Sequence, residues 1–238
     1  MEMLLHGIMW YAIFLFSTTL HESAHALAAY LLGDSTAYHE GQVTLDPLPH
    51  MRREWAGTIL VPILSFLISR GAWMMGWASA PFNPLWAMRY PKRAAMMALA
   101  GPLANLLLVL AAWGGIHWGI HTGVLVEPKT MIMSKMVWAA QPGPYNSLAV
   151  FLSITFSLNL LLFVFNLLPL PPMDGSTVLY FFISEDTARK LMQILQTPLF
   201  SVLGFMAAWL VFAKVFKPVF FAVINLMYPG LSYQPSVG

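Results

Sequence analysis

The chain contains no cysteine, so it can form neither a disulfide bond nor a thiolate metal site. Charge is also scarce: 9% of its 238 residues are charged, whereas about 25% is usual for a soluble domain. So few charges could not cover the surface of a soluble globule of this size. Because 58% of the residues are hydrophobic, the composition indicates that the solvent is mostly lipid. The lipid bilayer is therefore the first partner that we expect.

The small positive charge also restricts the partners. The formal net charge is +2, and no run of basic residues forms a phosphate-binding stripe. We therefore expect no nucleic-acid partner. No internal repeat or soluble module is visible in the sequence. These observations predict a single membrane-embedded domain over residues 1–238.

Long apolar runs predict about four membrane-crossing helices, since a span needs roughly 20 residues. Three runs cover residues 3–32, 94–116 and 148–168, and a last apolar region covers residues 198–227. That last region contains two lysines and one internal proline, Pro218, so the sequence leaves open whether it is one bent helix or a hairpin. The predicted fold class is an all-α polytopic membrane protein.

Two shorter segments predict additional elements. Residues 56–69 form an apolar run of only 14 positions, which is short for a crossing. The glycines and prolines of residues 71–84 favour an extended return rather than a helix, so we expect a re-entrant segment. GQVTLDP, residues 41–47, alternates in polarity and predicts a short strand over 41–46 that ends at Pro47. This strand is the small β element of the predicted fold.

HESAH, residues 21–25, lies within the first predicted span. On a helix, positions i and i+4 face the same way about 6 Å apart, so His21 and His25 can bind one metal ion. Glu22 lies near enough to accept a proton from an attacking water. Nitrogen and oxygen ligands suit Zn²⁺, and a catalytic zinc keeps one position open for water.

The membrane setting gives this short motif its weight. On a soluble helix, two histidines and a glutamate often form nothing more than a solvated face. In a membrane helix, an ionisable group costs at least about 2.5–3.5 kcal/mol to insert, and HESAH places three of them within five residues. A structural role would need partners for all three, whereas a metal site accounts for them together.

Two histidines leave a catalytic zinc one protein ligand short. The candidates for the third ligand are Asp174, Asp34, Asp46, Glu40, His39 and His50. Asp174 is the best placed, because it follows a complete span and a proline-broken turn. The same residue could instead cap the next helix at its N-terminus, and the local sequence leaves both roles open.

Three motifs occur in the order found in a known family. They are HESAH in the first span, AGPLAN at 100–105 and NLLPLPPMDG at 166–175. Together they make the chain similar to the site-2 protease family of intramembrane metalloproteases, over roughly residues 15–180. The stretches GTILVPIL and GWASAPFNP also resemble the compact bacterial members of that family.

The resemblance implies roles for six residues. The implied zinc ligands are His21, His25 and Asp174, and Glu22 is the implied general base. Asn105 and Asn166 match positions that hold substrate or stabilise the oxyanion. An asparagine in a membrane helix often only bonds a neighbouring helix, so both roles stay open for these two residues.

The function implied is that of an intramembrane zinc metalloprotease. Its substrate would be a membrane protein with a transmembrane helix, cleaved within or beside the bilayer as in regulated intramembrane proteolysis. The alternative is a membrane zinc transporter or metal sensor with the same histidine and aspartate ligands. Glu22 discriminates between them, because transport needs ligands whereas proteolysis also needs an adjacent base.

The ligand set also implies a topology. For Asp174 to reach the depth of HESAH, span 148–168 must run in the same direction as the first span, and span 94–116 must run oppositely. Residues 56–93 must then leave and return on one side. The basic residues expected on that side are Arg52, Arg53, Arg89, Lys92, Arg93, Arg189 and Lys190. By the positive-inside rule that side is cytoplasmic, which predicts a multi-pass protein of the cell membrane, the inner membrane in a bacterium, with its active site toward the cytoplasm.

Overall fold

A computed structural model describes residues 2–128, 131–195 and 197–230. Its elements in chain order are α1 (Glu2–Leu31), α2 (Thr36–His39), α3 (Pro47–Arg53), the π-helical turn η1 (Ala56–Leu60), α4 (Val61–Ile68), α5 (Pro84–Arg89), α6 (Pro91–His121), β1 (Leu125–Val126), β2 (Trp138–Ala139), α7 (Tyr145–Asn166), α8 (Asp174–Val178), the 3-10 turn η2 (Leu179–Phe181), α9 (Glu185–Leu195) and α10 (Pro198–Met227). The predicted all-α class is confirmed. Residues 231–238, the end of the predicted single domain, lie outside the described residues.

Three helices of the described chain are long and apolar enough to cross a membrane: Met3–Leu31, Pro91–His121 and Tyr145–Asn166. A fourth is added if Glu185–Leu195 and Leu199–Phe212, which meet at 94°, count as one span. This agrees with the prediction of about four spans. The last apolar region, which the sequence left open, is the single helix α10 with Pro218 inside it.

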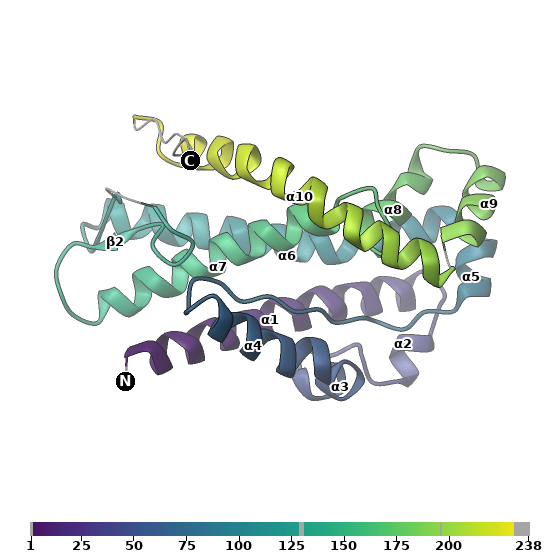
Figure 1. The fold of residues 1–238 in the computed structure, drawn as a ribbon, viewed down its shortest axis with the longest axis horizontal. Coiled ribbons are helices and arrows are strands. Elements are labelled where there is room, and N and C mark those ends of the chain that lie inside the picture. The colour runs from purple at the N-terminus through teal and green to yellow at the C-terminus, as the bar shows by residue number, and fades with distance from the viewer. Residues whose placement is uncertain (1, 129–130, 196, 231–238) are drawn as a thin grey trace.

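The long helices alternate in direction as the ligand argument required. In Figure 1, α1 and α7 run one way, while α6 lies between them in the chain and runs back. Buried side chains of α6, α7 and α10, among them Ile116, Phe156 and Ile224, form one core cluster. A second cluster joins α1 to α4 and α7 through residues such as Phe14 and Phe66.

Residues 56–83 form a hairpin that begins and ends at the same end of α1. η1 and α4 run along α1, and the chain then returns as an extended segment to α5 (Figure 1). The turn lies beside the first turns of α1, because the ring centroids of Phe66 and His6 are 6.2 Å apart. At the return end, the backbone N–H of Asn83 donates to the carboxylate of Asp34, just after α1, at 2.7 Å. The predicted excursion and its extended return are therefore present.

The prediction of a strand over residues 41–46 is wrong. This segment has no strand, and the described sheet is the antiparallel pair of β1 and β2. The alternation was misleading because Asp46 and Pro47 are a helix start rather than a strand end. The Asp46 carboxylate accepts from Leu48 N–H at 2.9 Å, and Pro47 takes the first helical position of α3.

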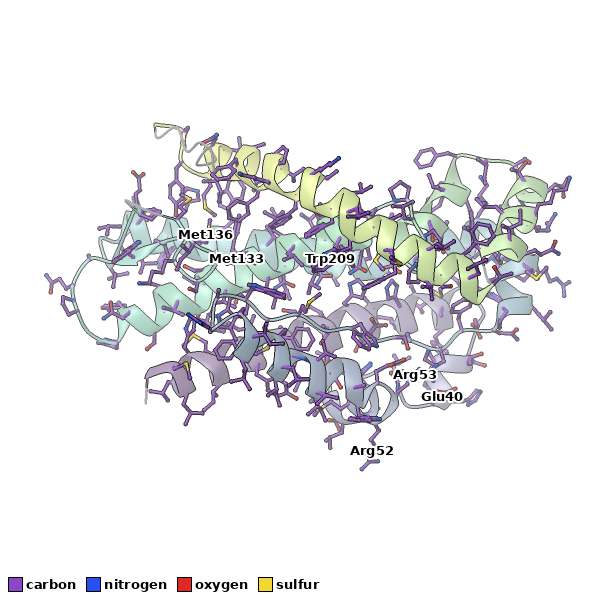
Figure 2. All side chains as sticks on the ribbon, in the orientation of Figure 1. Glu40, Arg52, Arg53, Met133, Met136 and Trp209 are labelled. Carbon is purple, nitrogen blue, oxygen red and sulfur yellow. The ribbon has the colours of Figure 1, made fainter. Side chains whose placement is uncertain are left out.

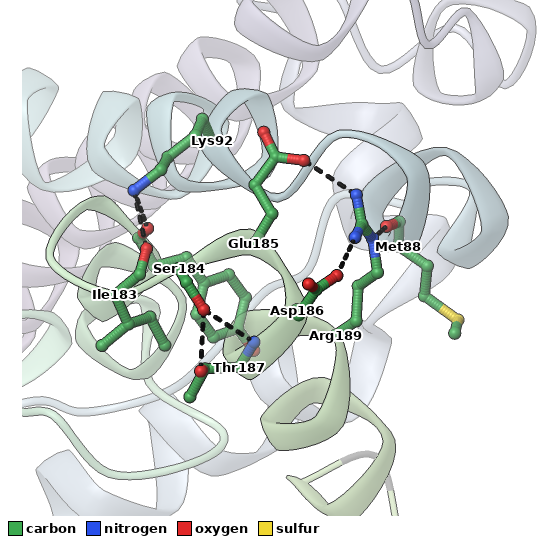
Figure 3. Close-up of polar contacts among 9 residues, drawn as sticks. Met88, Lys92, Ile183, Ser184, Glu185, Asp186, Thr187 and Arg189 are labelled. Atoms are coloured by element: carbon green, nitrogen blue, oxygen red, sulfur yellow. Dashed lines mark hydrogen bonds and ion pairs between the residues drawn. The ribbon is translucent and has the colours of Figure 1, made fainter.

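Two basic side chains connect η2 to the start of α6 and α9 to α5 (Figure 3). The Lys92 ammonium donates at 2.8–2.9 Å to three backbone carbonyls, those of Tyr180, Phe181 and Ile183. Arg189 donates to the Met88 carbonyl at 3.1 Å and forms ion pairs within α9. The three carbonyls follow directly on α8, so Lys92 helps to hold the segment that begins with Asp174.

Candidate metal centre

Three predicted ligand residues meet in the interior. α1 presents His21 and His25 one turn apart, both less than a tenth exposed, with their Nε2 atoms 2.9 Å apart. The Asp174 carboxylate, at the start of α8, has Oδ2 at 3.2 Å from Nε2 of His21 and 3.3 Å from Nε2 of His25. One ligand atom from each residue lies within 4.8 Å of the others. Residues far apart in the chain thus form one compact donor group.

Each imidazole makes a hydrogen bond through Nδ1, which leaves its Nε2 atom available to bind a metal ion. Nδ1 of His25 lies 2.8 Å from the backbone carbonyl of Met97, which can only accept, so this nitrogen carries the proton. Nδ1 of His21 lies 2.6 Å from Oδ1 of Asn105. In the neutral rings, both Nε2 lone pairs then face each other and the carboxylate, an arrangement that a cation would stabilise. Two imidazoles and a carboxylate are a donor set that zinc accepts.

Gly101 leaves room for this donor group. A Cβ at this position of α6 would lie 2.3 Å from Nε2 of His25 and 2.6 Å from Nε2 of His21. Any side chain here would therefore fill the space that an ion needs or push the imidazoles aside. Sequence reasoning did not single out Gly101, although the AGPLAN motif contains it.

The non-helical turn between α7 and α8 brings Asp174 into place. α7 ends at Asn166, and α8 starts directly over that end, because a Cβ on Gly175 would lie 2.3 Å from the carbonyl oxygen of Leu167. The capping position of α8 is Met173, not Asp174. Of the two local roles left open by the sequence, the structure directs the carboxylate to the histidines.

The donor group opens into a cavity of about 660 Å³. Glu22 lines it beside the three ligands, is 6% exposed, and makes no hydrogen bond or ion pair within the described chain. The extended residues 75–82 form another wall, and Asn166 lines the cavity as well. A free carboxylate next to the donor group is thus placed to move a proton in a space that a peptide segment could enter.

The profile of Peptidase family M50 matches residues 9–211. The chain belongs to peptidase family M50. Of its relatives, YwhC of Bacillus subtilis is 35% identical over 178 residues, covering 74% of this chain and 70% of YwhC. Rip2 of Mycobacterium tuberculosis is 31% identical over 190 residues, covering 77% of this chain and 61% of Rip2. Both names provisionally assign a zinc metalloprotease activity.

These findings confirm the resemblance to site-2 proteases and identify the M50 chain as a membrane zinc metallopeptidase with zinc as its cofactor. A membrane protein is the general class of substrate for this family. The matched region spans about three fifths of Rip2 from Mycobacterium tuberculosis. Rip2 of Mycolicibacterium smegmatis is 26% identical, and 58% of its length is covered. No solved structure matches the chain significantly.

The other candidate ligands of this M50 peptidase have different surroundings. Asp34 is buried and its carboxylate accepts from backbone and hydroxyl groups, Asp46 caps α3, and Glu40 pairs with an arginine at 2.8 Å. His50 lies 3.2 Å from a backbone carbonyl, and His39 is exposed. Within residues 2–128, 131–195 and 197–230, none of the five joins the donor group.

The two asparagines of the family motifs are in different places in the M50 peptidase. Asn166 lines the cavity. Asn105 is fully buried and bonds His21 on one side and Asn159 of α7, at 2.8 Å, on the other. Sequence reasoning missed Asn159, because it lies in the plain apolar stretch of α7 with no motif around it.

Proposed function

We propose that this metallopeptidase cleaves transmembrane or membrane-proximal segments of membrane proteins, as in regulated intramembrane proteolysis. One observation carries the proposal: the donor group and Glu22 are buried among helices α1 and α6, both long and apolar enough to cross a membrane. A site built from residues inside such helices requires the peptide bond to come to the bilayer. His21, His25 and Asp174 are the proposed zinc ligands.

The proposed mechanism divides the work among the chain's own groups. When bound, zinc acts as a Lewis acid on the scissile carbonyl and lowers the pKa of water. Glu22, which makes no hydrogen bond or ion pair among the described residues, accepts the proton of the attacking water and passes it to the leaving amine. Asn166, on the cavity wall, is our candidate to hold the substrate or to donate to the developing oxyanion.

A transmembrane helix must unwind before its amide bonds can be attacked, and unwound backbone needs a wet cavity or protein partners in the bilayer. The extended residues 77–82 offer such partners. One edge is already bonded to the protein: Trp77 N–H donates to the Gly57 carbonyl at 3.1 Å, and Asn83 N–H donates to Asp34. Since hydrogen-bonding directions alternate along an extended strand, the backbone groups of Ala78, Ala80 and Phe82 point to the other edge.

That second edge is open, because the backbone groups of Ala78, Ala80 and Phe82 make no hydrogen bond within the described chain. The unwound substrate is proposed to pair with this edge as an added strand. The other segment considered for this role, residues 41–46, is no strand and does not line the cavity.

Replacing Ala80 by proline is expected to lower kcat/KM for a single-span substrate by about tenfold, because one central donor of the open edge is lost. Ala80→Val is the matched control, since it adds bulk and keeps the backbone N–H. Cleavage rates of both variants in liposomes, with zinc occupancy measured in parallel, decide the point. Equal losses in the two variants would assign the effect to bulk and remove the added-strand model.

We also propose that the end of α1 nearest the donor group faces the cytoplasm of a cell, at its inner membrane in a bacterium. Basic side chains gather there: Arg93 donates to the carbonyl of Leu32, the residue after α1, at 3.0 Å. Figure 2 shows Arg53 and Glu40 directed toward one another, whereas Arg52 points away from the protein. The positive-inside rule supports this orientation.

Single cysteines test the orientation well, since the chain has none of its own. Cysteines in place of Arg52 and Arg89, both exposed and on either side of the 56–83 hairpin, are expected to react with a membrane-impermeant thiol reagent only from the cytoplasmic side. A cysteine in place of the exposed Glu127, past the far end of α6, is the control and should react only from the other side. Labelling of Arg52→Cys and Arg89→Cys from opposite faces would contradict the topology.

A further inference from the structure

A line of buried polar groups crosses the bundle behind His21. Asn105 of α6 and Asn159 of α7 are both 0% exposed, as is Ser17 of α1. Asn105 Nδ2 donates to Asn159 Oδ1 at 2.8 Å, and Asn159 Nδ2 donates to Ser17 Oγ at 2.9 Å and to the Thr155 carbonyl at 2.8 Å. On its other side, Asn105 Oδ1 lies 2.6 Å from Nδ1 of His21. The line therefore ends on a proposed zinc ligand.

Only one orientation of the amides satisfies every contact in this line. The Thr155 carbonyl can only accept, so the nitrogen of Asn159 must face it and the oxygen of Asn159 must face Asn105. Asn105 must then present its nitrogen to Asn159 and its oxygen to His21. That oxygen needs a proton from Nδ1 of His21, which leaves the lone pair of His21 on Nε2, toward Asp174 and His25.

We propose that Asn159 is a positioning residue for zinc binding. The Thr155 carbonyl fixes the orientation of the Asn159 amide, which fixes that of Asn105, and Asn105 in turn orients the ring of His21. This arrangement selects the Nδ1–H tautomer of His21 and holds the ring with Nε2 toward the ion. The inference rests on the proposed role of His21 as a ligand. It assigns a function to a residue outside the cavity that touches neither the ion nor the substrate.

The partner of His21 needs to be held in one orientation, whereas the partner of His25 does not. The ring of His25 is oriented by a backbone carbonyl, that of Met97, which cannot rotate or exchange its donor and acceptor. The ring of His21 faces a side-chain amide, which can flip by 180° and would then present a donor to Nδ1. Asn159, itself fixed by a main-chain carbonyl, removes that freedom because a flipped Asn105 would place two oxygens against each other.

The test measures zinc affinity of the full-length protein by competition with a chromophoric chelator. Asn159→Leu, of similar size, is expected to weaken zinc binding by about 10–100-fold, the usual effect of losing an outer partner of a ligand. Asn159→Leu added to Asn105→Leu should weaken it no further, since the first acts through the second. Ser157→Ala is the matched control: Ser157 is equally buried in α7 and bonds two backbone carbonyls outside this line, so zinc affinity should not change.

A spectroscopic measurement on the unaltered sequence keeps the proposal testable if Asn159→Leu does not fold. In ¹⁵N-histidine-labelled, zinc-free protein, the resonances lost in His21→Gln should show the Nδ1–H tautomer. The Nε2–H tautomer at His21, unchanged zinc affinity in Asn159→Leu, or an equal loss in Ser157→Ala would overturn the proposal. Full zinc occupancy in His21→Ala would overturn it in a different way, by removing His21 from the proposed ligand set.

Discussion

Glu22→Gln is expected to abolish peptide hydrolysis while zinc stays bound and the fold stays intact. Glutamine keeps the size of the side chain and one oxygen, but it cannot accept the proton of the attacking water. Glu22 makes no hydrogen bond or ion pair in the described chain, so the exchange breaks no such contact. General base catalysis typically contributes about 10²–10⁴-fold, so the rate constant for cleavage should fall by that factor.

The assay uses enzyme in liposomes with a single-span substrate that carries helix-weakening residues, and zinc content is measured on the same preparation. Glu185→Gln is the matched control, because it makes the same chemical change on an exposed residue of α9 that pairs with Arg189. A zinc transporter with the same ligands would behave differently: Glu22→Gln would keep zinc flux, and neither form would cleave peptides. Cleavage that persists undiminished in Glu22→Gln would leave the enzyme but remove this mechanism.

The half of the site that lies on one helix follows from the sequence. His21, Glu22 and His25 need only the geometry of a helix to face one another, and the cost of placing them in a membrane points to a metal. Asp174 could not be chosen on local grounds, because an aspartate before glycine and serine is also a good helix cap. The resemblance to site-2 proteases supplied the choice, since only the fold brings α8 over the end of α7.

The local sequence could not predict features that depend on tertiary contacts. Residues 41–46 alternate like a strand, yet no segment of the described chain pairs with them, and the Asp46–Pro47 pair starts a helix instead. The extended nature of residues 77–82 followed from their glycines and prolines, but the open edge depends on which backbone groups Gly57 and Asp34 occupy. Asn159 shows the same limit, because its role depends on partners in two other helices.

Asp174→Ala is expected to remove zinc from the purified protein, which in the unaltered sequence should hold about one ion per chain. The carboxylate contributes the charged donor of the group, with Oδ2 at 3.2 and 3.3 Å from the two imidazole nitrogens. Without it, two neutral imidazoles remain, which is one ligand fewer than catalytic zinc sites use. The loss of affinity should therefore exceed the roughly 10–100-fold typical of outer partners.

Metal analysis after dialysis against a graded series of zinc buffers measures this loss, with His21→Ala and His25→Ala as variants expected to behave alike. Asp46→Ala is the matched control: it removes an aspartate that caps α3, which costs about 1 kcal/mol of stability without touching the donor group. If Asp174→Ala kept both full occupancy and activity, the third ligand would be another residue. Asp34 would be an unsuitable candidate, because its carboxylate already accepts hydrogen bonds from Thr36 and Asn83. Glu40 would be the next residue to alter, since its ion pair with Arg53 is exposed.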